Sequence, residues 1–72
     1  MSATAAPRIL VVDDERTIVR ALSAALEARD YRVDVAADGR SAVAEAAATA
    51  PDLIILDLGL PDLDGIEVCR RI

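Results

Sequence analysis

The sequence predicts an α/β fold, in which a doubly wound parallel sheet carries helices on both of its faces. Short apolar runs that suit buried strands alternate along the 72 residues with longer segments of helical periodicity. The helical segments are too long for hairpin connections, so the strands they join are expected to run parallel. We expect strands over residues 8–12, 32–36 and 53–56, and helices over residues 17–29, 41–50 and 66–72.

The first strand and the first helix are the clearest pair of elements. Residues 8–12 read RILVV, without polar alternation, which is typical of a strand covered on both faces. The following segment repeats large aliphatic residues at helical spacing and is expected to turn that face toward the core. These residues are Ile18, Leu22 and Leu26. Asp14, just before this segment, is the expected N-cap of the helix.

The other elements are predicted from composition and turn residues. Residues 32–36 alternate polar and apolar side chains and indicate a strand nearer the edge of the sheet. Residues 41–50 are rich in alanine, which favours a helix, and we expect its inward stripe to consist of Ser41, Val43 and Ala47. Residues 53–56 read LIIL, the most apolar run in the chain, and lead directly into Asp57. We expect them to form a central strand that belongs to the core and is covered on both faces.

Composition and charge exclude several classes of function. The chain has no histidine and one cysteine, Cys69, which excludes Cys/His zinc sites and internal disulfides. The formal net charge is -5, and phosphate contacts need clustered Lys and Arg, so we expect no direct contact with nucleic acid. No apolar run approaches the roughly 20 residues of a membrane span. Residues 1–7 are expected to form a disordered tail rather than a signal peptide, and a lone thiol without such a signal favours a cytoplasmic location.

Carboxylates follow two of the predicted strands. Asp13 and Asp14 follow the first strand, and Asp57 follows the third. The carboxyl ends of neighbouring parallel strands form a ligand crevice, so the three side chains converge if these strands are neighbours. Clustered carboxylates repel one another, a bound divalent cation relieves that repulsion, and oxygen ligands favour Mg²⁺ or Mn²⁺ over zinc. Because an aspartate can itself accept a phosphoryl group, the group indicates phosphoryl chemistry.

Each acidic residue alone has a simpler interpretation. Acids after a strand often only cap the next helix, and Asp57 alone can be a solvated strand end. The combination is more specific because a segment with strong turn chemistry follows Asp57. Its turn residues are Gly59, Pro61, Asp62, Asp64 and Gly65.

Together these motifs resemble the receiver domain of bacterial two-component response regulators. Residues 11–15 read VVDDE, and residues 51–72 read PDLIILDLGLPDLDGIEVCRRI. The second segment is most similar to regulators of the OmpR type, including potassium-transport (Kdp) regulators. The resemblance covers residues 8–72 and implies the N-terminal part of a flavodoxin-like receiver fold, with three strands, two helices and part of a third.

The resemblance also implies a role for each candidate site residue. Asp57 is the implied phosphoacceptor, which takes a phosphoryl group from a sensor histidine kinase. Asp14 is the implied direct ligand of Mg²⁺, Asp13 acts largely through water, and Gly59 offers its backbone carbonyl. The implied protein is a signalling domain rather than an enzyme, and it controls transcription through an output domain outside this chain.

The family pattern also contains parts without a counterpart in these 72 residues. They are a hydroxyl residue after a fourth strand and a lysine after a fifth, which contact the phosphoryl group in the family. We therefore expect the chain alone not to switch on phosphorylation, and its third strand to form an open edge that favours a homodimer or edge-paired oligomer.

Two alternative functions compete with this interpretation, and the residues argue against the second of them. The first is a truncated, non-switching fragment that acts only by self-association or binding. The second is a Mg²⁺-dependent phosphatase of the haloacid-dehalogenase type. Such phosphatases need a second aspartate two residues after the first, where this chain has Gly59.

Overall fold

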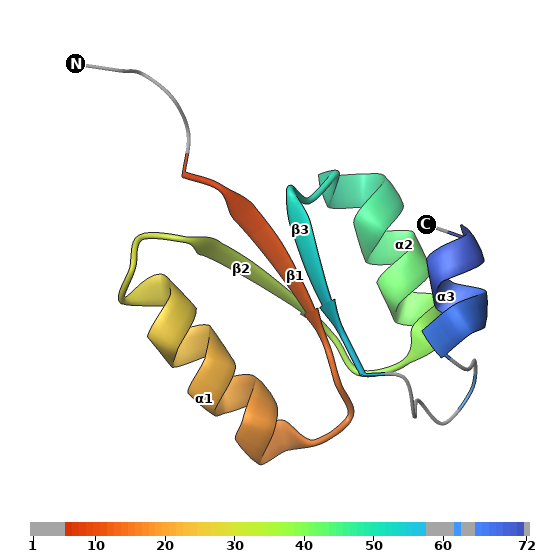
Figure 1. The fold of residues 1–72 in the computed structure, drawn as a ribbon, viewed down its shortest axis with the longest axis horizontal. Helices are drawn as coiled ribbons and strands as arrows, with labels where there is room; N and C mark the ends of the chain where they lie inside the picture. Colours follow the sequence, from red (N-terminus) through yellow and green to blue (C-terminus); the bar gives the residue numbers. More distant parts are fainter. Residues whose placement is uncertain (1–5, 58–61, 63–64, 72) are drawn as a thin grey trace.

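The computed structural model contains six elements in the expected order (Figure 1). It describes residues 6–57, 62 and 65–71. The strands are β1 (Arg8–Val12), β2 (Arg32–Ala36) and β3 (Leu53–Leu56). The helices are α1 (Arg16–Glu27), α2 (Gly39–Thr49) and α3 (Gly65–Arg71). The strands have their predicted bounds, whereas each helix begins one or two residues earlier than predicted.

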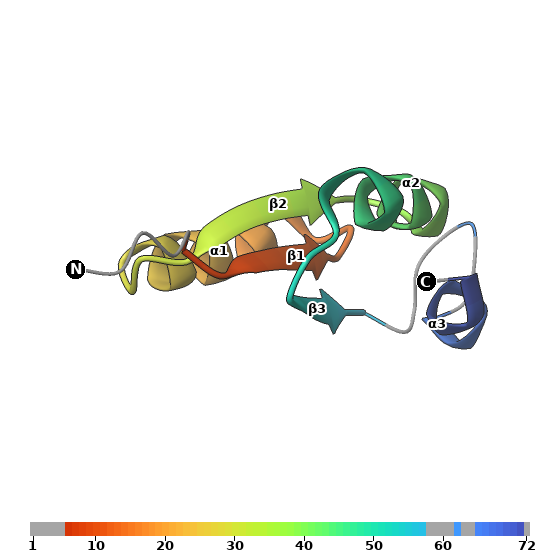
Figure 2. The same ribbon diagram turned by 90° about the horizontal axis from the view of Figure 1, so that it is seen from above.

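The three strands form one parallel sheet in the order β2-β1-β3. In this register Val12 of β1 lies opposite both Ala36 of β2 and Leu56 of β3. Figure 2 shows all three arrowheads pointing the same way, so the strands end at a common edge. The first and third strands are therefore neighbours, as the convergence of the acidic residues requires. The central strand of the described sheet is β1, and β2 and β3 are its outer strands.

Helices cover both faces of the sheet. Along β1 successive side chains point to opposite faces, and Leu10 and Val12 pack with α2 and α3. The helix α1 packs against β1 and β2, on the other side of the sheet from α2 and α3 (Figure 1). This is the layered arrangement that the alternation of strands and helices predicts.

The best-packed part of the core lies between the sheet and α2. The strands supply Leu10, Val12 and Ala36, and the helices supply Ala42 and Val68, all of them buried. Four of these five side chains are 1% exposed or less. Because Ala42 is small and fully buried, α2 can approach the strands closely, and a larger side chain at that position would prevent this.

The predicted inward stripe of α2 is wrong at two of its three positions. Ser41 and Ala47 are exposed, while Ala42 is buried and Val43 and Ala46 are partly buried. In an alanine-rich helix the faces differ little in hydrophobicity, so the pattern fixes the orientation poorly. The contact with the sheet decides the orientation instead.

The predicted core role of two large aliphatic residues is also wrong. Ile18 on α1 is 46% exposed and Leu53 on β3 is 55% exposed. Leu22 and Leu26 of α1 are partly buried, as their place on the predicted apolar face requires. Ile18 and Leu53 are exposed because the described part of the chain does not cover them.

The N-cap of α1 is Glu15 rather than the predicted Asp14, and its side chain makes no capping hydrogen bond. Asp13 serves this end of the helix instead, because its Oδ1 accepts a 2.9 Å hydrogen bond from the backbone N–H of Glu15.

Among the described residues, none of the helices is long and apolar enough to cross a membrane.

Candidate functional site

Two backbone hydrogen bonds extend the sheet by one residue, into the acidic positions. The N–H of Asp13 donates to the carbonyl of Ala36 at 3.1 Å, and the N–H of Asp57 donates to the carbonyl of Val12 at 2.8 Å. Both aspartates are therefore held at the carboxyl edge of the sheet by the same ladder that pairs the strands. The sequence places them there because each follows directly after an apolar strand.

The three predicted carboxylates converge at this edge and form what we call the acidic site: Asp13, Asp14 and Asp57. One carboxylate oxygen from each residue lies within 4.8 Å of the others. Asp13 and Asp57 are partly buried and Asp14 is exposed. The expected convergence is thereby confirmed, and three negative charges at this separation favour a bound cation.

A hydrogen bond fixes the direction of one of these side chains. Asp13 accepts the Glu15 amide at the amino end of α1, where the helix dipole favours negative charge. Asp14 does not cap α1, because the N-cap residue of that helix is Glu15. The exposed Asp14 carboxylate is therefore available at the surface of the site.

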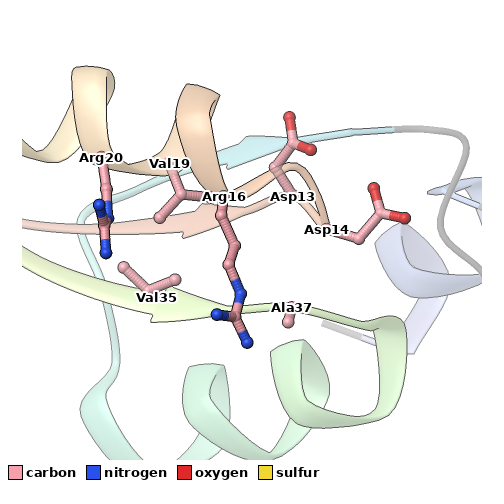
Figure 3. Close-up of a pocket in the computed structure, with 7 residues that line it drawn as sticks. All are labelled: Asp13, Asp14, Arg16, Val19, Arg20, Val35 and Ala37. Carbon is pink, nitrogen blue, oxygen red and sulfur yellow. The ribbon is translucent and has the colours of Figure 1, made fainter.

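A cavity of about 280 Å³ opens beside the acidic site, between α1 and the end of β2 (Figure 3). Figure 3 shows the guanidinium groups of Arg16 and Arg20 reaching from α1 toward β2, whereas the carboxylates of Asp13 and Asp14 point away from them. In the described part of the chain no ion pair joins these arginines to these two aspartates. Arg16 and Arg20 therefore do not neutralise Asp13 and Asp14 by direct ion pairing. The residues that line the cavity are Asp13, Asp14, Arg16, Val19, Arg20, Val35 and Ala37.

The structure brings together three of the four predicted site residues. The fourth, Gly59, lies outside the described residues, so its role as a carbonyl ligand stays a prediction.

The structure adds a residue that the sequence placed only in a turn-rich segment. Asp62 accepts two backbone N–H groups at the start of α2. These partners lie more than 20 residues away in the sequence, so no local sequence pattern predicts the contact.

A comparison with protein families identifies the family to which this chain belongs. The model of the response regulator receiver domain matches residues 9–72. This chain belongs to that family. The predicted receiver resemblance is confirmed, and the phosphatase alternative has no support from this match, since position 59 is glycine.

Several curated relatives of this receiver domain are named as transcriptional regulatory proteins. The alkaline phosphatase synthesis transcriptional regulatory protein PhoP of Bacillus subtilis is 52% identical over 65 residues, which cover 90% of this chain and 27% of PhoP. The transcriptional regulatory protein KdpE of Mycobacterium tuberculosis is 52% identical over 60 residues, which cover 83% of this chain and 26% of KdpE. The chain thus spans about a quarter of the length of these relatives, and the predicted similarity to OmpR-type and Kdp regulators is confirmed.

Solved structures show the same fold. The N-terminal domain of a response regulator receiver protein from Methanoculleus marisnigri is 40% identical, with a TM-score of 0.86 over 90% of this chain and 53% of that one. The receiver domain of Ssk1 from Saccharomyces cerevisiae, crystallised with the histidine phosphotransfer signaling protein Ypd1, is 27% identical. Its TM-score is 0.87 over 97% of this chain and 48% of that one. The predicted receiver fold is confirmed, and the non-switching alternative gains no better support from these matches.

Proposed function

We propose that this receiver chain is a phosphoacceptor that takes a phosphoryl group onto Asp57, with Mg²⁺ held at the acidic site. The observation that carries the proposal is the convergence of Asp13, Asp14 and Asp57 within 4.8 Å at the carboxyl edge of the sheet. Ligands bind at that edge in open parallel sheets. In a member of the receiver family, this edge is where phosphoryl transfer is expected.

The donor set fits magnesium. Asp13, Asp14 and Asp57 offer hard carboxylate oxygens, and magnesium usually takes one or two carboxylates and keeps several waters. The chain has no histidine, which removes the side chain that zinc and copper prefer. The backbone carbonyl of Gly59 is the further ligand we propose. When bound, the ion neutralises part of the acidic charge and the charge on the incoming phosphoryl oxygens.

The proposed reaction needs one nucleophile on this chain. A carboxylate oxygen of Asp57 donates an electron pair to the phosphorus of a phosphohistidine. The bond between phosphorus and the ring nitrogen breaks, its electron pair stays on that nitrogen, and Asp57 becomes an acyl phosphate. The ladder bond from the Asp57 amide to Val12 holds the nucleophile in place.

The phosphoryl donor we propose is a sensor histidine kinase or a phosphotransfer protein. The complex of the Ssk1 receiver domain with Ypd1 supports a protein donor of that kind. The names of PhoP and KdpE support an output in the control of transcription, through a domain outside this chain. We propose the cytoplasm as the location, and signalling rather than turnover of a substrate as the activity.

The decisive experiment follows the label from the donor. In the full-length protein, Asp57→Asn keeps the size of the side chain and removes the nucleophilic carboxylate, so uptake of phosphoryl label from the kinase is lost. Asp52→Asn, at the opposite edge of the sheet, is the matched control and keeps the wild-type level. The bound label is released by hydroxylamine, as expected for an acyl phosphate. Labelling of Asp57→Asn at the wild-type level contradicts the proposal.

A further inference from the structure

Asp62 makes a contact that joins two distant parts of the chain. Its Oδ1 accepts the backbone N–H of Gly39 at 2.6 Å, and its Oδ2 accepts the backbone N–H of Arg40 at 3.0 Å. These partners lie 23 and 22 residues earlier in the sequence. The carboxylate therefore binds the amino end of α2 with both of its oxygens.

This contact completes the hydrogen bonding at the start of α2. The first N–H groups of a helix have no partner within the helix. The side chain of Asp38, the N-cap, accepts the N–H of Ser41 at 2.8 Å. The N–H groups of Gly39 and Arg40 are satisfied by Asp62 instead. The helix thus depends on a residue that follows β3 for two of its first three amides.

Electrostatics strengthens the same contact. A carboxylate at the amino end of a helix interacts favourably with the helix dipole, and the Asp62 side chain is only 26% exposed. The Nε of Arg40 lies 4.0 Å from Asp62, but the Arg40 side chain is 82% exposed. An ion pair so exposed contributes little, so the two backbone hydrogen bonds dominate.

The contact lies at the same edge of the sheet as the acidic site. The helix α2 begins three residues after Ala36, whose carbonyl accepts the N–H of Asp13. Asp57 is held to Val12 at that edge, and Asp62 follows it by five residues, a reach of at most about 17 Å. The chain is therefore attached by hydrogen bonds at Asp57, to β1, and five residues later at Asp62, to the amino end of α2.

From this double attachment we infer that Asp62 is a positioning residue of the acidic site. Its carboxylate fixes residue 62 at the amino end of α2. Together with the ladder bond from Asp57 to Val12, this second attachment limits where Asp57 stands relative to Asp13 and Asp14. Asp62 takes no part in the chemistry itself. The inference rests on the proposed function, because it assigns Asp62 to the site at which the metal and the phosphoryl group bind.

The test compares Asp62→Ala with Asp52→Ala in the full-length protein. Asp52 is a matched control because it also accepts a backbone N–H from a distant strand, that of Arg8 at 2.8 Å, but at the opposite edge of the sheet. Two quantities are measured by NMR: the amide signal of Asp57 without metal, and the apparent dissociation constant in a titration with Mg²⁺ alone. Thermal unfolding of each variant controls for stability.

We expect Asp62→Ala to move the Asp57 amide signal and to raise the dissociation constant for Mg²⁺ about tenfold, as residues that support metal ligands do. Asp62→Asn keeps an oxygen acceptor and gives a smaller increase. Asp52→Ala changes neither quantity. A folded Asp62→Ala variant with an unchanged Asp57 signal and unchanged Mg²⁺ affinity overturns the inference.

The remaining outcomes separate this inference from the proposed function. If the wild-type protein binds no Mg²⁺, the proposed function fails, and the Asp57 signal in metal-free protein alone decides the role of Asp62. If Asp62→Ala does not fold, the same two measurements on Asp62→Asn decide it. Values equal to wild type in that variant overturn the inference.

Discussion

The backbone N–H of Asp57 donates a 2.8 Å hydrogen bond to the carbonyl oxygen of Val12. Asp57 lies one residue after Leu56, the last paired residue of β3. Since Asp13 directly follows Val12, this bond brings the ends of two strands, and the carboxylates that follow them, to one place. The acidic site is thus a product of strand pairing. It needs β1 and β3 to be neighbours and to end in register, and both conditions are met.

The first prediction concerns the metal. Titration of the wild-type protein with Mg²⁺ is expected to shift the amide signals of Asp13, Asp14 and Asp57, because their carboxylates lie within 4.8 Å of one another. Asp14→Ala removes a direct ligand and is expected to weaken binding at least about tenfold. Asp52→Ala, at the opposite edge, leaves the titration unchanged. Shifts confined to other residues, or surviving intact in Asp14→Ala, contradict the assignment.

The second prediction concerns how much the acidic site lowers the stability of the folded chain when no metal is bound. Three carboxylates in one group destabilise the folded chain through repulsion, so Asp14→Asn is expected to raise the midpoint of thermal unfolding in metal-free buffer. The exposed position of Asp14 limits the gain to at most about 1 kcal/mol. Saturating Mg²⁺ reverses the order, because the wild-type site binds the ion more tightly and therefore gains more stability from binding than the variant does. Equal midpoints in metal-free buffer show that the repulsion is already screened.

The third prediction concerns the end of α2. Ala50, its C-cap, has a left-handed backbone with φ 46 and ψ 63, a conformation that costs a residue with a Cβ about 1 kcal/mol or more. Ala50→Gly is therefore expected to stabilise the chain by about 1 kcal/mol, as measured by chemical denaturation. The matched control is Ala48→Gly, an exposed position inside the same helix. There the substitution destabilises by about 1 kcal/mol, and a loss of stability in both variants contradicts the account of Ala50.

The sequence predicts an element of this fold well where neighbouring residues differ strongly in hydrophobicity. The strands have their predicted bounds because apolar runs such as LIIL end abruptly in charged or turn-forming residues. The orientation of α2 was not predictable from Ser41 and Ala47, because alanine gives every face of that helix nearly the same hydrophobicity. The contact of Asp62 with Gly39 was not predictable at all, since it depends on two segments that only the folded sheet brings together.

The acidic site was also predictable only in part. Carboxylates that follow parallel strands meet at one edge whatever their exact side-chain positions, so the convergence of Asp13 and Asp57 could be predicted from their places in the sequence. The identity of the N-cap could not, because three acidic residues stand side by side and only the backbone geometry selects Glu15. That selection matters for function, since it leaves Asp14 exposed beside the other two carboxylates.

The last prediction concerns the 72-residue chain purified by itself. In the described sheet β3 pairs with β1 along one side only, and Leu53 at its start is 55% exposed. An apolar outer strand of this kind pairs readily with another chain. Burying one leucine or isoleucine side chain contributes about 1.5–3 kcal/mol, whereas a small domain is stable by only about 5–15 kcal/mol. We therefore expect the isolated chain to associate rather than to form a stable folded monomer.

Sedimentation and thermal unfolding over a range of concentrations measure this association. Leu53→Lys places a charge on the outer strand and is expected to reduce it, since charged side chains protect sheet edges. The matched control is Ile18→Lys, a residue of similar exposure at 46% on α1 rather than on the strand, and it leaves edge pairing in place. A compact monomer with a cooperative melt that does not depend on concentration would mean that these three strands and their helices are sufficient for a stable fold.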